Sequence, residues 1–228
     1  MTSPLTRTGY TMNFEQARFN MIEQQIRPWD VLDTQILQLL ATVKREDFVP
    51  TAHHALAFVD MEIPLGHGEC MLAPRVEARL LQDLHVQKHE KVLEIGTGSG
   101  YFAALLGHRA QNVLSLEINA DLARGAEKNL AQAGAHHVQV RVADGSGDLS
   151  ADGPFDVIVL SGSVAQVPAA LLNLLKVGGR LAAVVGQEPM MQAHFITRTG
   201  EASFPTRTPW DTVAPRLHHF AEASSFSF

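Results

Sequence analysis

Three glycines follow a short apolar run near the middle of the chain, in the stretch Val92-Leu93-Glu94-Ile95-Gly96-Thr97-Gly98-Ser99-Gly100-Tyr101. Residues 91–95 are typical of a β-strand, and residues 101–107 are typical of a helix. Glycines at such a junction permit a sharp turn and let amides at a helix N-terminus approach a ligand. A plain strand–helix turn is the alternative interpretation. A dinucleotide site would carry its third glycine one residue later, as GxGxxG.

Strands and helices alternate after this turn. The pattern predicts strands at 112–116, 138–142, 157–160 and 180–185, and helices at 121–133 and 168–175. Apolar strands that alternate with helices are typical of a parallel sheet covered on both faces. Beyond residue 187 the strand-like segments, at 193–199 and in the tail that ends at 225–228, have no helices between them. The predicted fold class is therefore α/β, a mostly parallel sheet with helices on both faces and an antiparallel C-terminal edge.

The first ninety residues follow a different pattern. Residues 1–12 are polar and are predicted to be a flexible leader. Apolar residues at helical spacing predict helices over 13–27 and from Asp33 onward, which Asp33 would cap, and a further helix over 75–84. The segment from Pro50 to Pro74 carries proline, glycine and histidine and is predicted to be irregular, as a substrate loop or a poorly ordered segment.

Composition excludes several classes of protein. The chain has 228 residues and a net charge of −6 without a run of Lys or Arg, which argues against a nucleic-acid partner. No apolar stretch reaches eighteen residues, and the N-terminus lacks the apolar core of a secretory signal, so no membrane partner is expected. Cys70 is the only cysteine, which excludes an internal disulfide and fits the cytoplasm. We expect a monomer or a weak homo-oligomer.

Acidic residues follow the predicted strands in a fixed order. Glu117 ends the second strand, where a carboxylate can accept both ribose hydroxyls, and Asp144-Gly145 follows the third, where the acid can bind an adenine amino group. Ligands of parallel sheets bind at the carboxyl ends of the strands.

Together with the glycine turn, these acidic residues resemble the S-adenosylmethionine site of Rossmann-like methyltransferases. The resemblance implies S-adenosylmethionine as cofactor and S-adenosylhomocysteine as product. The expected cofactor-binding residues are Cys70, Met71, Leu72, Glu94, Gly96, Thr97, Gly98, Ser99, Gly100, Tyr101, Glu117, Ile118, Asp144 and Gly145.

Further motifs narrow the resemblance to one family. Those motifs are Met21–Arg27, Val43–Pro50, Ala57–Asp60 and Ile63–Gly68, and residues 154–159 and 175–181 continue them. They are similar to protein-L-isoaspartate O-methyltransferases over about Met21 to Gly186. The resemblance implies a single methyltransferase domain over 13–228. It comprises a helical cover with a substrate loop (13–90), a cofactor-binding core (91–186) and a C-terminal edge (187–228).

The resemblance also locates a departure from the family pattern. After the Gly-x-Gly pair the family usually reads Gln-Thr-Ile-Ser-x-Pro, with the serine near the transferred methyl group, whereas this chain reads Glu69-Cys70-Met71-Leu72-Ala73-Pro74. Attack by an ionised carboxylate needs no general base, so the rate comes mainly from alignment in a sheltered site. Losing one hydrogen bond costs about 1–3 kcal/mol, but leucine also leaves a carboxylate without a partner. We therefore expect weak or absent isoaspartyl methylation, mainly because of Leu72.

Three functions remain open at this point. The leading hypothesis is O-methylation of a carboxylate in damaged protein or peptide, a step in protein repair. The alternatives are a methyltransferase of the same fold for a small-molecule acceptor, and a non-catalytic protein that binds S-adenosylmethionine. The candidate catalytic positions are Leu72 together with Asp60, His67, Ser161 and Ser163. His85 and His89 are four residues apart, but the predicted helix ends near His85, so no metal site is expected.

Overall fold

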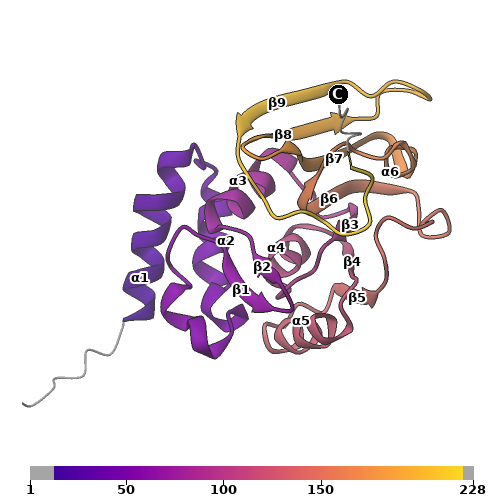
Figure 1. The fold of residues 1–228 in the computed structure, drawn as a ribbon. Helices are drawn as coiled ribbons and strands as arrows, with labels where there is room; N and C mark the ends of the chain where they lie inside the picture. The colour runs from indigo at the N-terminus through magenta and orange to yellow at the C-terminus, as the bar shows by residue number, and fades with distance from the viewer. Residues whose placement is uncertain (1–12, 223–228) are drawn as a thin grey trace, which may run out of the picture.

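A computed structural model describes residues 13–222, so the predictions for 1–12 and 225–228 lie outside the described residues. Seven strands form one sheet in the order β5-β4-β3-β6-β7-β8-β9 (Figure 1). Strands β3 to β7 are parallel, and β8 and β9 add an antiparallel edge, which confirms the predicted fold class. The strands are β3 (Lys91–Ile95), β4 (Asn112–Glu117), β5 (Val138–Val142), β6 (Phe155–Val164), β7 (Leu175–Gln187), β8 (Met190–Thr197) and β9 (Thr206–Asp211).

The two faces of the sheet are covered unequally. One core cluster joins Val92, Val157 and Val159 to the helices α3 (Pro74–Leu84), α4 (Tyr101–Arg109) and α5 (Ala120–Gln132). The residues that alternate with these along the strands, such as Leu93 and Ile158, point to the opposite face. There they pack with the short helix α6 (Ala169–Asn173) and with Phe220 from the C-terminal end. The chain after β9 therefore covers part of the sheet that only one short helix reaches.

The N-terminal cover begins with α1 (Phe14–Met21), which continues as a π-helix over Ile22–Ile26 and a 3₁₀ turn over Arg27–Trp29. Helix α2 (Thr34–Thr42) starts at Asp33, whose side chain accepts hydrogen bonds from Gln35 N and Ile36 N, as the sequence predicted. Two 3₁₀ turns, Arg45–Phe48 and Thr51–Leu56, lead into the next segment. Figure 1 shows this cover beside the sheet, in indigo and purple.

The segment from Pro50 to Pro74 is more regular than predicted. Strands β1 (Ile63–Gly66) and β2 (Glu69–Met71) pair as an antiparallel hairpin. At its tip Gly66, His67 and Gly68 all have positive φ angles, of 89°, 58° and 84°. Glycine adopts such angles without strain. The prediction of irregular structure is thus wrong for the hairpin, because its strands are too short to show alternation.

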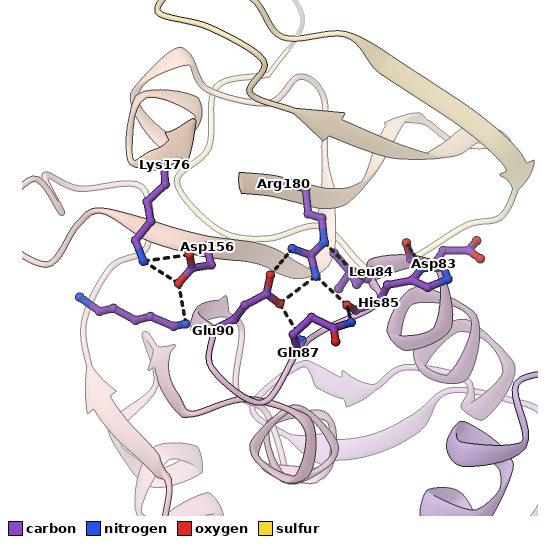
Figure 2. A network of polar contacts seen from close by, with 9 residues as sticks. Asp83, Leu84, His85, Gln87, Glu90, Asp156, Lys176 and Arg180 are labelled. Atoms are coloured by element: carbon purple, nitrogen blue, oxygen red, sulfur yellow. Dashed lines mark hydrogen bonds and ion pairs between the residues drawn. The ribbon is translucent and has the colours of Figure 1, made fainter. Parts of the chain in front are cut away.

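An ion-pair network attaches the end of α3 to the sheet (Figure 2). Arg180 of β7 donates hydrogen bonds to the backbone oxygens of Leu84 and His85 and to the carboxylate of Glu90. These bonds satisfy carbonyl groups that a helix C-terminus leaves free. The helix ends at Leu84 and His85 has a φ of 50°, so His85 and His89 do not share a helix face, as the sequence indicated.

No helix among residues 13–222 is both long and apolar enough to cross a membrane. The same residues contain no group of three or more His, Cys, Asp or Glu side chains arranged to hold a metal ion.

Candidate functional site

A cavity lies at the carboxyl ends of β3, β4, β5 and β6, and we call it the strand-end cavity. Its walls include six of the predicted cofactor residues on these strands and the turns after them, which are Gly96, Gly98, Glu117, Ile118, Asp144 and Gly145. The walls also include Glu69 and Cys70 of the hairpin, Ser161 and Gly162 of β6, and the segment Pro215–His218 with Phe220. The acids that the sequence places at successive strand ends therefore do converge on one cavity.

The glycine turn brings backbone to the cavity wall. Gly96 and Gly98 have φ angles of 98° and 54° and both line the cavity. Gly100 has a φ of 85°, but a Cβ there would lie 3.2 Å from Ala126 and Leu130, so this glycine allows α5 to pack closely. Tyr101 is 1% exposed, and the Arg45 guanidinium lies 5.0 Å from its ring centre. Gly100 and Tyr101, both predicted to bind cofactor, thus lie in the core behind the turn.

Glu117 joins the glycine turn to the end of β4. Its Oε2 accepts a hydrogen bond from Gly98 N at 2.8 Å, and its Oε1 accepts one from Asn119 N at 3.0 Å. An ionised carboxylate can accept about four hydrogen bonds in total. Both oxygens therefore keep capacity for a pair of hydroxyl groups in the cavity, and the two amide bonds hold the carboxylate in place.

Asp144 and Gly145 form the wall beyond β5. Asp144 accepts hydrogen bonds from Ser146 N and Oγ, and its Oδ2 lies 2.6 Å from His219 Nδ1. Partial burial raises the pKa of Asp144, but the hydrogen bonds from His219 and Ser146 outweigh burial and keep it below its ordinary value. A Cβ on Gly145 would lie 2.2 Å from Ile95 Cγ2, so only glycine fits there.

Glu94 lies beneath the turn, fully buried. Its two carboxyl oxygens are hydrogen-bonded by Ser115 Oγ at 2.6 Å and by Ser161 Oγ at 2.8 Å. Burial raises the pKa of Glu94 to about 8, against the opposing effect of these two hydrogen bonds. The group therefore holds its proton at neutral pH. A cation that bound nearby would favour its ionised form.

A second, smaller cavity adjoins the first and shares Cys70, Gly96, Gly98 and Ser161 with it. Met71, Leu72, Thr97 and Ser99 also line this second cavity. Leu72 is 5% exposed, and its backbone oxygen accepts a hydrogen bond from Arg45 Nη2 at 2.7 Å. Position 72 therefore lies beside the glycine turn, where it presents an apolar side chain.

The other candidate positions differ in how close they come to these cavities. Cys70 lines both, but burial, followed by the charge of Glu62, raises the pKa of its thiol to about 12 and keeps it protonated. His67 stands at the hairpin tip, with Nε2 3.9 Å from Asp121 Oδ2, and is not among the residues that line either cavity. Asp60 also lies outside both linings and pairs with Arg75.

Ser163 needs a correction. The sequence placed Ser161 and Ser163 in a turn after a strand that ended at Leu160, but β6 continues to Val164. Ser161 does reach the cavities, whereas Ser163 is 0% exposed within the strand. Ser163 therefore lies buried inside β6 and not in a turn after it. The strand extends because β7 and a later segment pair with it, which a local pattern does not reveal.

Sequence reasoning missed the contribution of residues 215–220. The yellow chain after β9 runs back to the strand ends (Figure 1). There His218 Nε2 lies 2.6 Å from Glu69 Oε1, and Leu217 lies against the glycines of the turn and of β6. The adjacent pair His218-His219 was the one available signal, and its members do point apart, to Glu69 and Asp144.

The fold and the strand-end site define a Rossmann-like methyltransferase. A crystal structure from Plasmodium falciparum that holds S-adenosyl-L-homocysteine superposes with a TM-score of 0.73, covers 91% of this chain and 99% of that one, and is 18% identical. A family model described as Protein-L-isoaspartate(D-aspartate) O-methyltransferase matches residues 16–212. The protein-L-isoaspartate O-methyltransferase of Koribacter versatilis is 37% identical over 191 residues, 84% of each chain. That of Rhodopseudomonas palustris is 39% identical over 185 residues, 81% of this chain and 85% of the relative. The chain therefore belongs to the protein-L-isoaspartate O-methyltransferase family.

Proposed function

We propose that this protein transfers a methyl group from S-adenosylmethionine to the free carboxylate of an isoaspartyl residue in a protein or peptide. Membership of the family is the observation that carries the proposal, since relatives 37% and 39% identical bear that name. The alternatives of a small-molecule acceptor and a non-catalytic homologue gain nothing from these relatives. We therefore propose the leading hypothesis and not either of these alternatives.

The residues that line the strand-end cavity are chemically suited to the cofactor. Glu117 offers two fixed carboxylate oxygens for ribose hydroxyls, and Gly145 lines the same cavity. Glu94, protonated when alone, can ionise beside a bound cation and stabilise its charge. When bound, S-adenosylmethionine supplies the electrophilic methyl group. Asp144 is the remaining acceptor, for an adenine amino group, and His219 occupies one of its oxygens.

The chain's own residues have two tasks in this reaction. The substrate carboxylate is ionised at neutral pH, so the protein need not remove a proton. It must hold the acceptor in line with the methyl group and exclude water, effects that account for much of the rate in such transfers. Leu72 shelters the site but donates no hydrogen bond from its side chain. The orientation of the carboxylate must therefore come from other groups.

Turnover on matched peptides tests this proposal. A peptide with one isoaspartyl residue should gain a base-labile methyl ester in the presence of S-adenosylmethionine, while the same peptide with ordinary aspartate should not. Mass spectrometry of both peptides measures the product. A Glu117→Ala variant, in which the cofactor should bind poorly, is the negative control. Equal methylation of the two peptides, or of neither, would contradict the proposed acceptor.

A further inference from the structure

Two buried polar atoms near the strand-end cavity have no hydrogen-bond partner among residues 13–222. They are Arg216 Nη1 and Ser163 Oγ. A buried donor without an acceptor costs about 1–3 kcal/mol, so native structures keep few such groups, and each calls for an explanation. Two of them on neighbouring segments point to a missing partner that both could bind.

The backbone places these two residues directly opposite each other. Ser163 and Arg216 form a parallel β-bridge, in which Ser163 N donates to Pro215 O at 2.6 Å and Leu217 N donates to Ser163 O at 2.9 Å. Residues paired across a bridge direct their side chains to the same face of the sheet. The serine hydroxyl and the guanidinium therefore share one face.

That face packs against the core cluster that contains Leu72. Ser163 also pairs with Val184 of β7, and Val184 belongs to the core cluster that contains Leu72. Ser161, two residues earlier on β6, binds Glu94 and lines both cavities. Arg216 lines the strand-end cavity as well. The two unpartnered atoms thus belong to the side of the site where a methyl acceptor would lie.

The guanidinium of Arg216 is held in a fixed orientation. Nη2 donates to Gly186 O at 2.9 Å, and Nε lies 3.2 Å from Glu222 Oε1. Nη1 is the guanidinium nitrogen that takes part in neither of these contacts. A positioned guanidinium donates strong, charge-assisted hydrogen bonds to carboxylates. Ser163 Oγ is a second donor on the same face.

We propose that Arg216 and Ser163 form the binding site for the acceptor's carboxylate. This inference rests on the proposed function, which supplies an acceptor of that chemistry. One carboxylate oxygen accepts hydrogen bonds from Arg216 Nη1 and Ser163 Oγ, and the other stays free to attack the methyl group. The pair supplies the orienting donors that the apolar side chain of Leu72 does not.

Access to this site requires the covering segment to move. Both atoms are buried, and Leu217 lies against the glycines between them and the turn. Two contacts at the surface hold the segment, one between His218 and Glu69 and one between His219 and Asp144. The two histidine side chains are 55% and 64% exposed, and the carboxylate side chains are 29% and 38% exposed. The segment is also held by the two backbone hydrogen bonds at Ser163 and by the hydrogen bond from Arg216 Nη2 to Gly186 O, which keep the two donors together. The acceptor therefore enters by a local displacement that leaves this bridge formed.

Calorimetry on the protein saturated with S-adenosylhomocysteine tests the proposal. The two probes are an isoaspartyl peptide and the same peptide with that carboxylate converted to the carboxamide. The parent protein should prefer the carboxylate. Arg216→Gln should remove the preference by weakening carboxylate binding about tenfold or more while leaving carboxamide binding unchanged. Arg216→Lys should restore part of the preference, and Ser163→Ala should lower it less than Arg216→Gln does.

The controls separate this site from the cofactor site and from the fold. Arg207→Gln changes an exposed arginine of β9 and should leave both peptide affinities unchanged. The affinity for S-adenosylhomocysteine and the melting temperature are measured for each variant. An Arg216→Gln protein that keeps the full carboxylate preference would overturn the inference. So would a loss confined to S-adenosylhomocysteine, because that result would assign Arg216 to the cofactor.

A direct probe distinguishes this inference from the proposed function. Succinate added to the parent protein should shift the NMR signal of Arg216 Nε–H, and Ser163→Ala should reduce the shift. If succinate shifts that signal but no isoaspartyl peptide is methylated, the carboxylate site stands and the isoaspartyl function falls. If the peptide is methylated and Arg216→Gln has no effect on its binding, the function stands and the carboxylate site falls.

Discussion

Replacing Leu72 with serine separates two effects that oppose each other. The side chain is 5% exposed and belongs to the main core cluster, so its removal leaves a cavity. Truncating a buried leucine costs about 2–5 kcal/mol of unfolding free energy. A loss of about 3 kcal/mol lowers the melting temperature by about 6–12 °C in a domain of this size. Leu72→Ser should thus be measurably less stable than the parent protein by calorimetry.

The same change restores a hydroxyl at the position where the family resemblance implies one. A hydrogen bond that orients the acceptor is worth about 1–3 kcal/mol, or about 5- to 150-fold in rate. We expect Leu72→Ser to raise kcat/KM on an isoaspartyl peptide by one to two decades, measured well below its melting temperature. Affinity for S-adenosylhomocysteine should hardly change, because Glu117 and Gly145 lie in the other cavity.

Leu72→Ala is the matched control for this experiment. It creates a similar cavity without a hydroxyl, so the ratio of the serine to the alanine rate isolates the hydrogen bond. Equal rates for the two variants would refute the reasoning. A parent protein that already methylates the peptide as fast as good enzymes do would also refute it, since leucine would then be tolerated.

Three further changes test the cofactor side. Glu117→Ala removes a fixed acceptor of two hydrogen bonds and should weaken S-adenosylhomocysteine binding more than about tenfold in calorimetry; unchanged affinity would reject its assignment. Gly145→Ala brings a methyl group to 2.2 Å from Ile95 Cγ2 and should cost about 1–3 kcal/mol, seen in denaturant unfolding. Unfolded Glu94 ionises near 4.5 while the folded group keeps its proton up to about 8. Its contribution to stability is therefore fully present below pH 4.5 and is lost as pH rises to about 8. Glu94→Gln should flatten that part of the stability–pH profile, and an identical profile would argue against the raised pKa.

Local sequence patterns predicted most of the sheet. Strands β3 and β5 occupy the predicted residues 91–95 and 138–142, and Asp33 caps α2. Each of these features depends on a few neighbouring residues, so periodicity and capping chemistry are sufficient. The convergence of Glu117 and Asp144 on the strand-end cavity was predictable for a related reason. Glu117 lies at a strand end, and parallel topology brings all strand ends to one edge.

The acceptor side depends on contacts that no local pattern encodes. Ser163 becomes buried because Arg216, 53 positions later, adds a bridge beside β6. His219 reaches Asp144 across a sequence separation of 75 residues. The hairpin at Ile63–Met71 likewise owes its strands to pairing and to glycines at its tip. Such interactions form only when the chain has folded.

The cofactor side and the acceptor side of the site differ in how they tolerate substitution. The cofactor side is built from backbone turns and strand-end acids, so a substitution there tends to cost the whole binding site. The acceptor side is built from single side chains on separate segments, which can change one at a time. The sequence combines an apolar residue at position 72 with Arg216, which pairs with Ser163 beside β6. A donor present on one segment can compensate in part for a donor that another segment lacks. Leu72→Ser and Arg216→Gln should therefore couple, because each variant changes the number of donors offered to the same oxygen atoms.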